Sequence, residues 1–339
     1  MPVVRNARPS DLDAILELAR TSGPGMTTLK ADRGALAQRL AVVADSFAGA
    51  IDLAAADYLF VLEDEANGRV CGVSAIKASV GLDTPFYSYR IGTSVHAHPQ
   101  KGLVNAVQAL YLSHDLAGAA ELCSLYLHPD YRQGMNGKLL SKSRLLFIAQ
   151  FPHLFPDKIF AEMRGYQDER GESPFWESIG RHFFRMDFQQ ADDLCGSGER
   201  LFIEQLMPRL PLYTQLLGDD ARAAIGRTHT DTAPARRLLE QEGLLFDGYI
   251  DIFDGGPVLQ ARVKELRVMR ESAVMPVIAG DDGGGEMALL AGGSQQGFRA
   301  VAGRAVACAE GIALAPPLLL ALDGASARVY FAGPRRSHA

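Results

Sequence analysis

The 339-residue sequence predicts an α/β protein with a mixed β-sheet and flanking helices. Short apolar runs typical of strands recur through the first 163 residues. A long helical pattern separates two of these strands, which requires a crossover connection in a sheet with parallel strands. The composition, 47% hydrophobic and 22% charged, is that of an ordinary globular protein, and the length predicts about two domains.

The first 80 residues predict two strand-forming regions around two helices. Residues 3–5 form the opening strand, and a helix follows in which Ser10 is the N-cap and Asp13 reaches back to the cap amide. A second helix is predicted over 33–48. Strands over 58–62 and 70–78, joined by an acidic turn, form a hairpin.

The middle of the chain carries the strand–helix–strand unit. Strand material is predicted over 86–95, a helix over 103–112 and a strand over 122–127. An amphipathic helix over 137–151 and a strand over 158–163 complete the unit.

The last part of the chain is helical at first and then rich in strands. Residues 191–226 predict helices with breaks at Pro208 and Pro211, and a helix over 234–241 ends at Gly243, a candidate left-handed cap. Beyond Tyr249 the pattern is strand-like and rich in glycine. Two helix–glycine–strand units, 175–184 and 238–246, share an outline that suggests internal duplication.

Charge and cysteine content exclude several classes of protein. A net charge of −6 disfavours binding to nucleic acid, and no apolar run reaches the length of a membrane helix. The N-terminus lacks a signal-peptide pattern, so we expect a cytoplasmic protein. The four cysteines are too far apart in sequence for a metal motif and predict reduced thiols and no metal site: Cys71, Cys123, Cys195 and Cys308.

The loop before the helix at 137–151 is a candidate anion site. Arg132, Gly134, Asn136 and Gly137 lie where a strand leads into a helix, whose first amides have no partner within the helix. Every charged residue from 132 to 144 is basic, which favours a phosphate group. The alternative is a solvated helix face after a glycine turn.

This loop resembles the acetyl-CoA motif of the GNAT acyltransferase superfamily, with Arg132 and Gly137 in matching positions and Met135 where the motif has glycine. Longer segments resemble the arginine N-succinyltransferase family from the N-terminus to about residue 270. These segments are YLFVLED (58–64), ELCSLYLHPDYR (121–132), NGKLLSKSR (136–144), AEMRG (161–165), SPFWESIGRHFF (173–184), IGRTH (225–229) and YIDIFDGGP (249–257).

The resemblance implies a GNAT-like fold duplicated as two related halves. It implies an acyl-CoA-binding domain over 1–190 and a second GNAT-like half with a glycine-rich β tail over 191–339. The implied activity is transfer of succinyl from succinyl-CoA, a co-substrate, to the α-amino group of L-arginine in arginine catabolism, with no tightly bound cofactor. Three alternatives stay open: another amine such as ornithine, a CoA-binding sensor, or one subunit of a two-chain enzyme. The chain is thus expected to form a homo-oligomer or to pair with a similar chain.

The resemblance also implies roles for individual residues. Leu125 falls on the position that contacts succinyl-CoA, and His229 falls on the proton donor, with Thr230 where the family commonly has proline. In GNAT folds a splay between strands exposes main-chain groups to the pantetheine arm, which would involve Leu125 and Leu127. As side chains alone, both leucines fit a hydrophobic core.

Candidate acceptor-binding residues come from charge chemistry. A guanidinium favours a carboxylate partner, and Glu121, Glu162 and Asp254 are candidates for this clamp or for a general base, a choice that stays open. Arg90 or Arg164 would hold the succinyl carboxylate. We expect direct transfer between the two bound substrates, with Cys123 serving packing rather than forming an acyl-enzyme.

Overall fold

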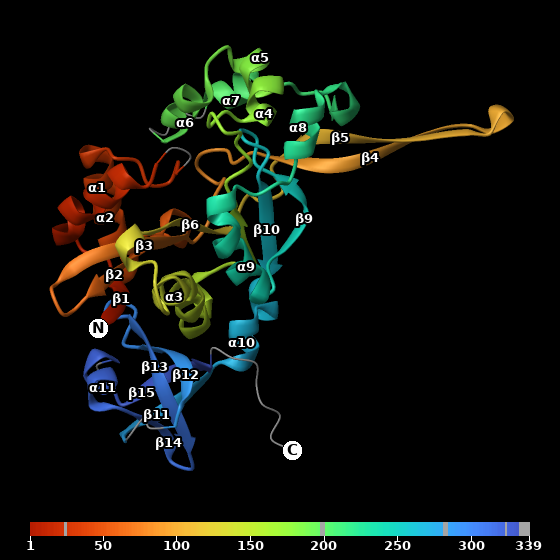
Figure 1. Ribbon diagram of the computed structural model, residues 1–339. Helices are drawn as coiled ribbons and strands as arrows, with labels where there is room; N and C mark the ends of the chain where they lie inside the picture. Colours follow the sequence, from red (N-terminus) through yellow and green to blue (C-terminus); the bar gives the residue numbers. More distant parts are fainter. Residues whose placement is uncertain (24–25, 197–200, 281–283, 323, 332–339) are drawn as a thin grey trace.

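The computed structural model describes residues 1–23, 26–196, 201–280, 284–322 and 324–331 (Figure 1). Within these residues fifteen strands form one extended sheet, in the order β12-β15-β11-β14-β13-β1-β2-β3-β6-β7-β10-β9-β4-β5-β8. The strands are β1 (Pro2–Asn6), β2 (Asp57–Asp64), β3 (Arg69–Lys77), β4 (Ser88–His98), β5 (Leu103–Ser113), β6 (Ala120–Leu127), β7 (Lys158–Glu162), β8 (Leu212–Tyr213), β9 (Leu245–Ile250), β10 (Pro257–Arg262), β11 (Ala273–Ala279), β12 (Glu286–Gly292), β13 (Arg299–Cys308), β14 (Gly311–Leu314) and β15 (Ser326–Phe331).

Eleven α-helices are present in the described part of the chain. They are α1 (Leu12–Thr21), α2 (Arg33–Ala48), α3 (Asn136–Gln150), α4 (Pro174–Ser178), α5 (Gly180–Phe184), α6 (Phe188–Gly196), α7 (Leu201–Leu206), α8 (Asp219–Ala224), α9 (Ala233–Gln241), α10 (Arg267–Glu271) and α11 (Pro316–Leu322). The predicted mixed sheet with flanking helices is confirmed. No helix among the described residues is long and apolar enough to cross a membrane.

The N-terminal part of the sheet is antiparallel from β1 to β6 and then parallel between β6 and β7. β2 is apolar along most of its length and buried from Asp57 to Leu62, because α1, α2 and α3 pack on β2 and β3. β6 and β7 pair at only two positions, Ala120 with Ile159 and Glu121 with Phe160. Beyond Glu121 the two strands therefore separate.

The start of α1 corrects the predicted cap. Ser10 does not cap the helix; instead the carboxylate of Asp11 accepts the backbone N–H of Arg8 at 2.7 Å and pairs with Arg5. Asp13 forms an exposed ion pair with Arg33. The second helix has the predicted bounds, and its cap is Asp32.

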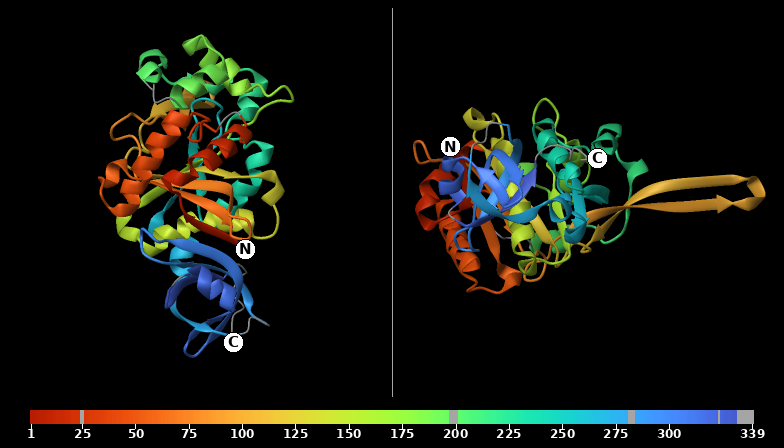
Figure 2. Two further views of the ribbon diagram at one scale, coloured as in Figure 1. Left: turned by 90° about the vertical axis from the view of Figure 1, so that its left-hand side faces the viewer. Right: turned by 90° about the horizontal axis from the view of Figure 1, so that it is seen from below.

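The helix predicted over 103–112 is wrong, because this segment is strand β5. It pairs with β4 in an antiparallel ribbon of eleven residue pairs, from Ser88 with Ser113 to His98 with Leu103. The ribbon projects far from the rest of the molecule (Figures 1 and 2).

The helix predicted over 137–151 is present as α3, but it is not amphipathic. Every residue from Leu139 to Ala149 is buried, because strands and other helices surround α3. Lys142 forms a buried ion pair with Glu242, and Arg144 donates to the backbone oxygens of Ser141 and Cys123 at 3.1 and 3.3 Å. Two of the basic residues assigned to the anion site therefore stabilise the interior.

The later segments continue the same sheet. β10 pairs with β7 over five residues, and Gly243 after α9 has φ +100°, as expected for a left-handed cap. β13 pairs with β1, while β11–β15 and α11 form the glycine-containing C-terminal body. The division into halves at residue 190 stays a prediction.

Candidate active site

A cavity of about 690 Å³ opens where β6 and β7 separate. One wall is the main chain of β6 and β7, and another is the loop into α3. The remaining walls come from segments distant in sequence, including 26–28, 251–254 and parts of 231–239. Of the site residues expected from the sequence, the cavity is lined by Glu121, Leu125, Leu127, Arg132, Gly134, Gly137, Glu162, Arg164 and Asp254.

A β-bulge in β6 shapes the inner wall. Ser124 has φ +51°, and the pairing of β3 with β6 shifts register at this point. The Ser124 N–H donates to Oγ1 of Thr28 at 3.1 Å and its hydroxyl donates to the Thr28 carbonyl at 2.9 Å. Arg39 in turn donates to the Ser124 hydroxyl at 3.0 Å. These contacts hold a left-handed conformation that L-residues rarely adopt.

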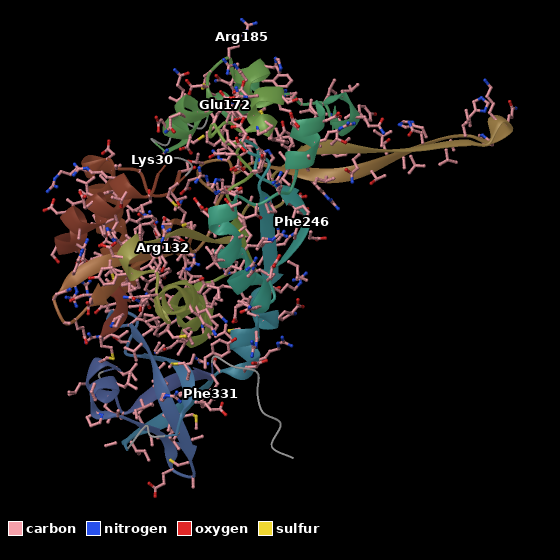
Figure 3. All side chains as sticks on the ribbon, in the orientation of Figure 1. Lys30, Arg132, Glu172, Arg185, Phe246 and Phe331 are labelled. Atoms are coloured by element: carbon pink, nitrogen blue, oxygen red, sulfur yellow. The ribbon has the colours of Figure 1, made fainter. Side chains whose placement is uncertain are left out.

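The loop into α3 has the form expected for an anion site. Gly134 has φ +58°, and the side chain of Asn136 donates to the carbonyl of Tyr131 at 3.0 Å. Arg132 reaches back so that its Nε donates to the Leu127 carbonyl at 2.9 Å (Figure 3). Asn136 itself does not line the cavity; it holds the loop that does. Gly137 and Lys138 at the start of α3 therefore line the same cavity as Leu125 and Leu127 at the end of β6.

Asp254 fixes a tight turn at the far wall. Its carboxylate accepts the N–H groups of Gly165 and Gly256 at 2.6 and 2.8 Å. Side chains are excluded at both glycines: a Cβ on Gly256 would lie 2.0 Å from the Met163 carbonyl. Asp251 lies next to Asp254 and is half-buried, and its desolvation together with the Asp254 charge raises the pKa of Asp251 to about 8.

Arg164 provides a cation at the end of β7. One nitrogen of its guanidinium donates to Gln167, while its Nε is buried without a hydrogen-bond partner among the described residues. Burial lowers the pKa of Arg164, and the charge of Asp254 opposes that shift. Arg90 has a different location: it is exposed on β4, over the ring of Tyr249, and does not line the cavity.

His229 lies beside the cavity rather than in its lining. Its backbone N–H donates to the Arg164 carbonyl at 2.8 Å, which ties its loop to the end of β7. Its Nδ1 accepts the N–H of Asp231 at 3.2 Å, so the neutral ring carries its proton on Nε2. Burial and the charge of Arg164 lower the pKa of His229.

The same turn occurs twice in the chain. Nδ1 of His128 accepts the N–H of Asp130 at 3.3 Å, as His229 does from Asp231, and a short 3-10 segment and a helix follow each histidine. The helices are α3 and α9. This repetition differs from the one expected between 175–184 and 238–246, because it involves the histidine turns rather than the helix ends.

Several acidic residues of the cavity wall were missed from the sequence. Asp192 on α6 accepts from Thr27 at 2.6 Å and pairs with Lys30, which lies between α6 and the first two helices (Figure 3). Asp231 and Asp251 also line the cavity. Asp192 and Asp231 lie outside the segments quoted above, and Asp251, although within YIDIFDGGP, was not singled out; the fold brings all three to this wall. The Cys123 thiol is buried, and burial raises its pKa to about 11, which makes it a poor nucleophile.

Comparisons with known proteins agree on one family. The family model described as "Arginine N-succinyltransferase beta subunit" matches residues 2–268. Arginine N-succinyltransferase subunit beta of Pseudomonas aeruginosa is 50% identical over 83% of this chain and 82% of its own. Arginine N-succinyltransferase of Yersinia pestis is 47% identical over 89% and 88%. The solved structure of arginine/ornithine succinyltransferase subunit AI from Pseudomonas aeruginosa superposes with a TM-score of 0.90 at 38% identity, covering 98% of this chain and 99% of that one.

Proposed function

The chain belongs to the arginine N-succinyltransferase family and is an acyltransferase of arginine catabolism, and from this premise we propose its full reaction. The succinyl group of succinyl-CoA passes to the α-amino group of L-arginine, giving N2-succinyl-L-arginine and CoA in the cytoplasm. The observation that carries the proposal is the polarity of the cavity. Arg132 and Lys138 line the cavity beside the loop into α3, and the carboxylates of Glu121, Glu162 and Asp254 line it together with Arg164.

The carrier binds at the α3 end. Arg132 and the amides of the loop through Gly134 and Gly137 receive the phosphates of CoA, while Asn136 keeps the loop in place. The pantetheine arm then pairs with the free edge of β6 at Leu125 and Leu127, as an added strand would. Main-chain groups make these bonds, so the leucine side chains remain packed.

The acceptor binds among the carboxylates. Glu121 and Glu162 lie on the two strands that border the opening and clamp the guanidinium of arginine. Asp254 already accepts two backbone N–H groups, so it positions the turn rather than the substrate. Arg164 holds the succinyl carboxylate, a role that Arg90 is too remote to share.

Transfer is direct. The deprotonated α-amine attacks the thioester carbon, the C–N bond forms, and collapse of the tetrahedral intermediate breaks the C–S bond and releases the CoA thiolate. The protonated ring of His229, whose Nδ1 lies 3.8 Å from the Asp231 carboxylate, supplies the proton that the thiolate takes up, and the proton lost by the amine passes through water to restore the ring. The high pKa of the Cys123 thiol argues against an acyl-enzyme.

The test is thiol release by the purified chain. With succinyl-CoA and L-arginine together, we expect free CoA to accumulate with one N2-succinyl-L-arginine for each CoA. Ornithine in place of arginine, and acetyl-CoA in place of succinyl-CoA, serve as the selectivity controls. Release that is equally fast with ornithine or acetyl-CoA would contradict the proposed substrates.

A second function is favoured by the printed name of one relative, "subunit beta". On this reading the chain is one subunit of a two-chain enzyme. The purified chain would then bind CoA without turnover, and addition of a similar second chain would restore activity.

A further inference from the structure

The outer part of the β4–β5 ribbon, residues 91–108, has no neighbouring strand. β9 pairs with β4 only at Tyr89 and Arg90, and β8 pairs with β5 only at Ala109 and Leu110. Beyond these points both edges of the ribbon are open within the described part of the chain. A two-stranded ribbon alone in water is at best marginally stable.

One face of the ribbon carries apolar pairs at its root and near its tip, interrupted by the polar pair of Thr93 and Gln108. Pairing sets Ile91 opposite Leu110 at the root, where both pack on buried side chains of the body. On the same face farther out, Val95 lies opposite Ala106 and Ala97 opposite Val104. Val95 is 62% exposed and Val104 72% exposed. Apolar side chains of the kind that are buried at the root thus recur on the solvent-exposed part of the ribbon.

The ribbon lacks the features that protect open strand edges. Residues 91–114 contain no aspartate or glutamate, and Lys101 is their single lysine or arginine. Soluble proteins commonly guard exposed edges with charge, and an uncovered apolar strip indicates an interaction surface. The opposite face is more polar, since it pairs His96 with Asn105.

Two observations identify the partner as another copy of this chain. The chain has a net charge of −6, and residues 91–114 contribute the +1 of Lys101, so the rest of the chain carries −7. The ribbon, which has no carboxylates, therefore complements the acidic body of another copy. Exposed apolar side chains also surround the root of the ribbon: Leu210 is 80% exposed and Leu216 is 84% exposed. Phe246 on β9 lies near the same root (Figure 3).

We propose that the ribbon is a dimerisation arm, which packs its apolar face on the root region of a second copy related by two-fold symmetry. The root and the arm lie on one face of the molecule, so each copy offers both halves of the contact, as an isologous interface requires. Each contact then occurs twice. Because two arms contribute, the total surface that they bury approaches the roughly 1,200–2,000 Å² that stable protein–protein interfaces bury.

The experiment measures the mass of the full chain in solution by light scattering after gel filtration. The wild type is expected at twice its 36.6 kDa. The double variant Val95→Glu/Val104→Glu places two charges on the apolar face and is expected at the mass of one chain. Asn105→Glu, which adds a charge next to Val104 but on the other face, is the matched control and should remain a dimer.

Two results would overturn the proposal: a wild type with the mass of one chain at tens of micromolar, or a double variant that is still dimeric. Hydrogen exchange on the wild type gives a second readout that needs no variant. Exchange over residues 91–98 should slow as protein concentration rises, and exchange independent of concentration would contradict the arm. Neither measurement depends on the proposed reaction, so the two proposals fail separately.

Discussion

The protonation state of His229 matters most at the residue scale. Its lowered pKa and the N–H of Asp231 on Nδ1 together favour a neutral ring with its proton on Nε2. The form that gives its proton to the thiolate is the imidazolium, and the lowered pKa makes it a stronger acid but a smaller fraction of the enzyme at neutral pH. We therefore expect the alkaline limb of kcat/KM that belongs to this histidine, where the proton donor is lost, to lie below its ordinary pKa of 6.5.

Replacing His229 by alanine should lower kcat by about 10²–10⁴-fold, the usual contribution of a general acid. Affinity for CoA, measured by calorimetry, should not change, because the proposed role of the ring is to protonate the thiolate formed in the reaction and not to hold the bound carrier. His182→Ala, at an exposed position on α5, is the control and should leave both quantities unchanged. Full turnover in the His229 variant would remove it from the mechanism.

The pair of Asp251 and Asp254 predicts a pH dependence of stability. The pKa of Asp251 is raised from 3.8 to about 8 in the folded protein, so the fold favours its protonated form. The stability associated with that proton is present at low pH and is lost as the pH rises from about 4 to about 8. Asp251→Asn should therefore melt above the wild type at pH 9 and close to it at pH 5.

Thermal unfolding followed across this pH range provides the measurement. Asp247→Asn, at an exposed position on β9, should follow the wild type at every pH. If Asp251→Asn loses as much stability at alkaline pH as the wild type does, other groups cause that loss.

At the scale of single elements, the bulge in β6 determines whether the cavity is open. Ser124→Val places a β-branched residue at φ +51°, which costs about 1–2 kcal/mol and favours a regular strand. We expect the dissociation constant for CoA to rise about tenfold, since 1.4 kcal/mol corresponds to that factor. Ser124→Gly keeps the conformation and should bind CoA nearly as well as the wild type does. If both variants bind CoA with equal affinity, the conformation of the bulge does not determine CoA binding.

The helix α3 depends on a buried ion pair. Lys142 and Glu242 are 3% and 0% exposed, and Tyr330 donates to the same Glu242 oxygen at 2.7 Å. Lys142→Met leaves the carboxylate buried without its cation, which should lower the free energy of unfolding by about 3–5 kcal/mol in urea titrations. The double variant Lys142→Met/Glu242→Gln removes both charges and should recover much of the loss. No recovery would show that packing, and not charge, dominates.

Most elements could be predicted from local pattern, and the exceptions have physical causes. Residues 103–112 contain leucine, alanine and glutamine at spacings that suit a helix, and only pairing with β4 makes them a strand. The sequence alone predicts that Lys142 and Arg144 are surface cations, because their buried partners lie far along the chain or are backbone oxygens. The loop into α3 could be predicted as a candidate anion site because its residues are contiguous. Asp192, Asp231 and Asp251 were missed because they meet only in the fold.

At the scale of the whole molecule, the C-terminal body is integral to the core although the family match ends at residue 268. The ring of Phe298 packs edge-on against Phe60 and Phe147, with centroids 5.6 and 5.1 Å away. Phe298→Ala should therefore destabilise the fold by about 3–5 kcal/mol. Leu320→Ala, where the side chain is 80% exposed on α11, should have little effect. Chemical denaturation distinguishes the two, and equal stability would mean that the C-terminal body is dispensable.

The separation of β6 and β7 bears on how this protein can be re-engineered. The groups exposed there belong to the main chain, which stays the same whatever side chains are installed nearby. In the proposed reaction, acceptor choice depends on carboxylate side chains of the cavity, which can be replaced. A library of variants at Glu121, Glu162 and Asp231 could thus be screened for new amine acceptors, while the main-chain groups proposed to bind the acyl donor are the same in every variant.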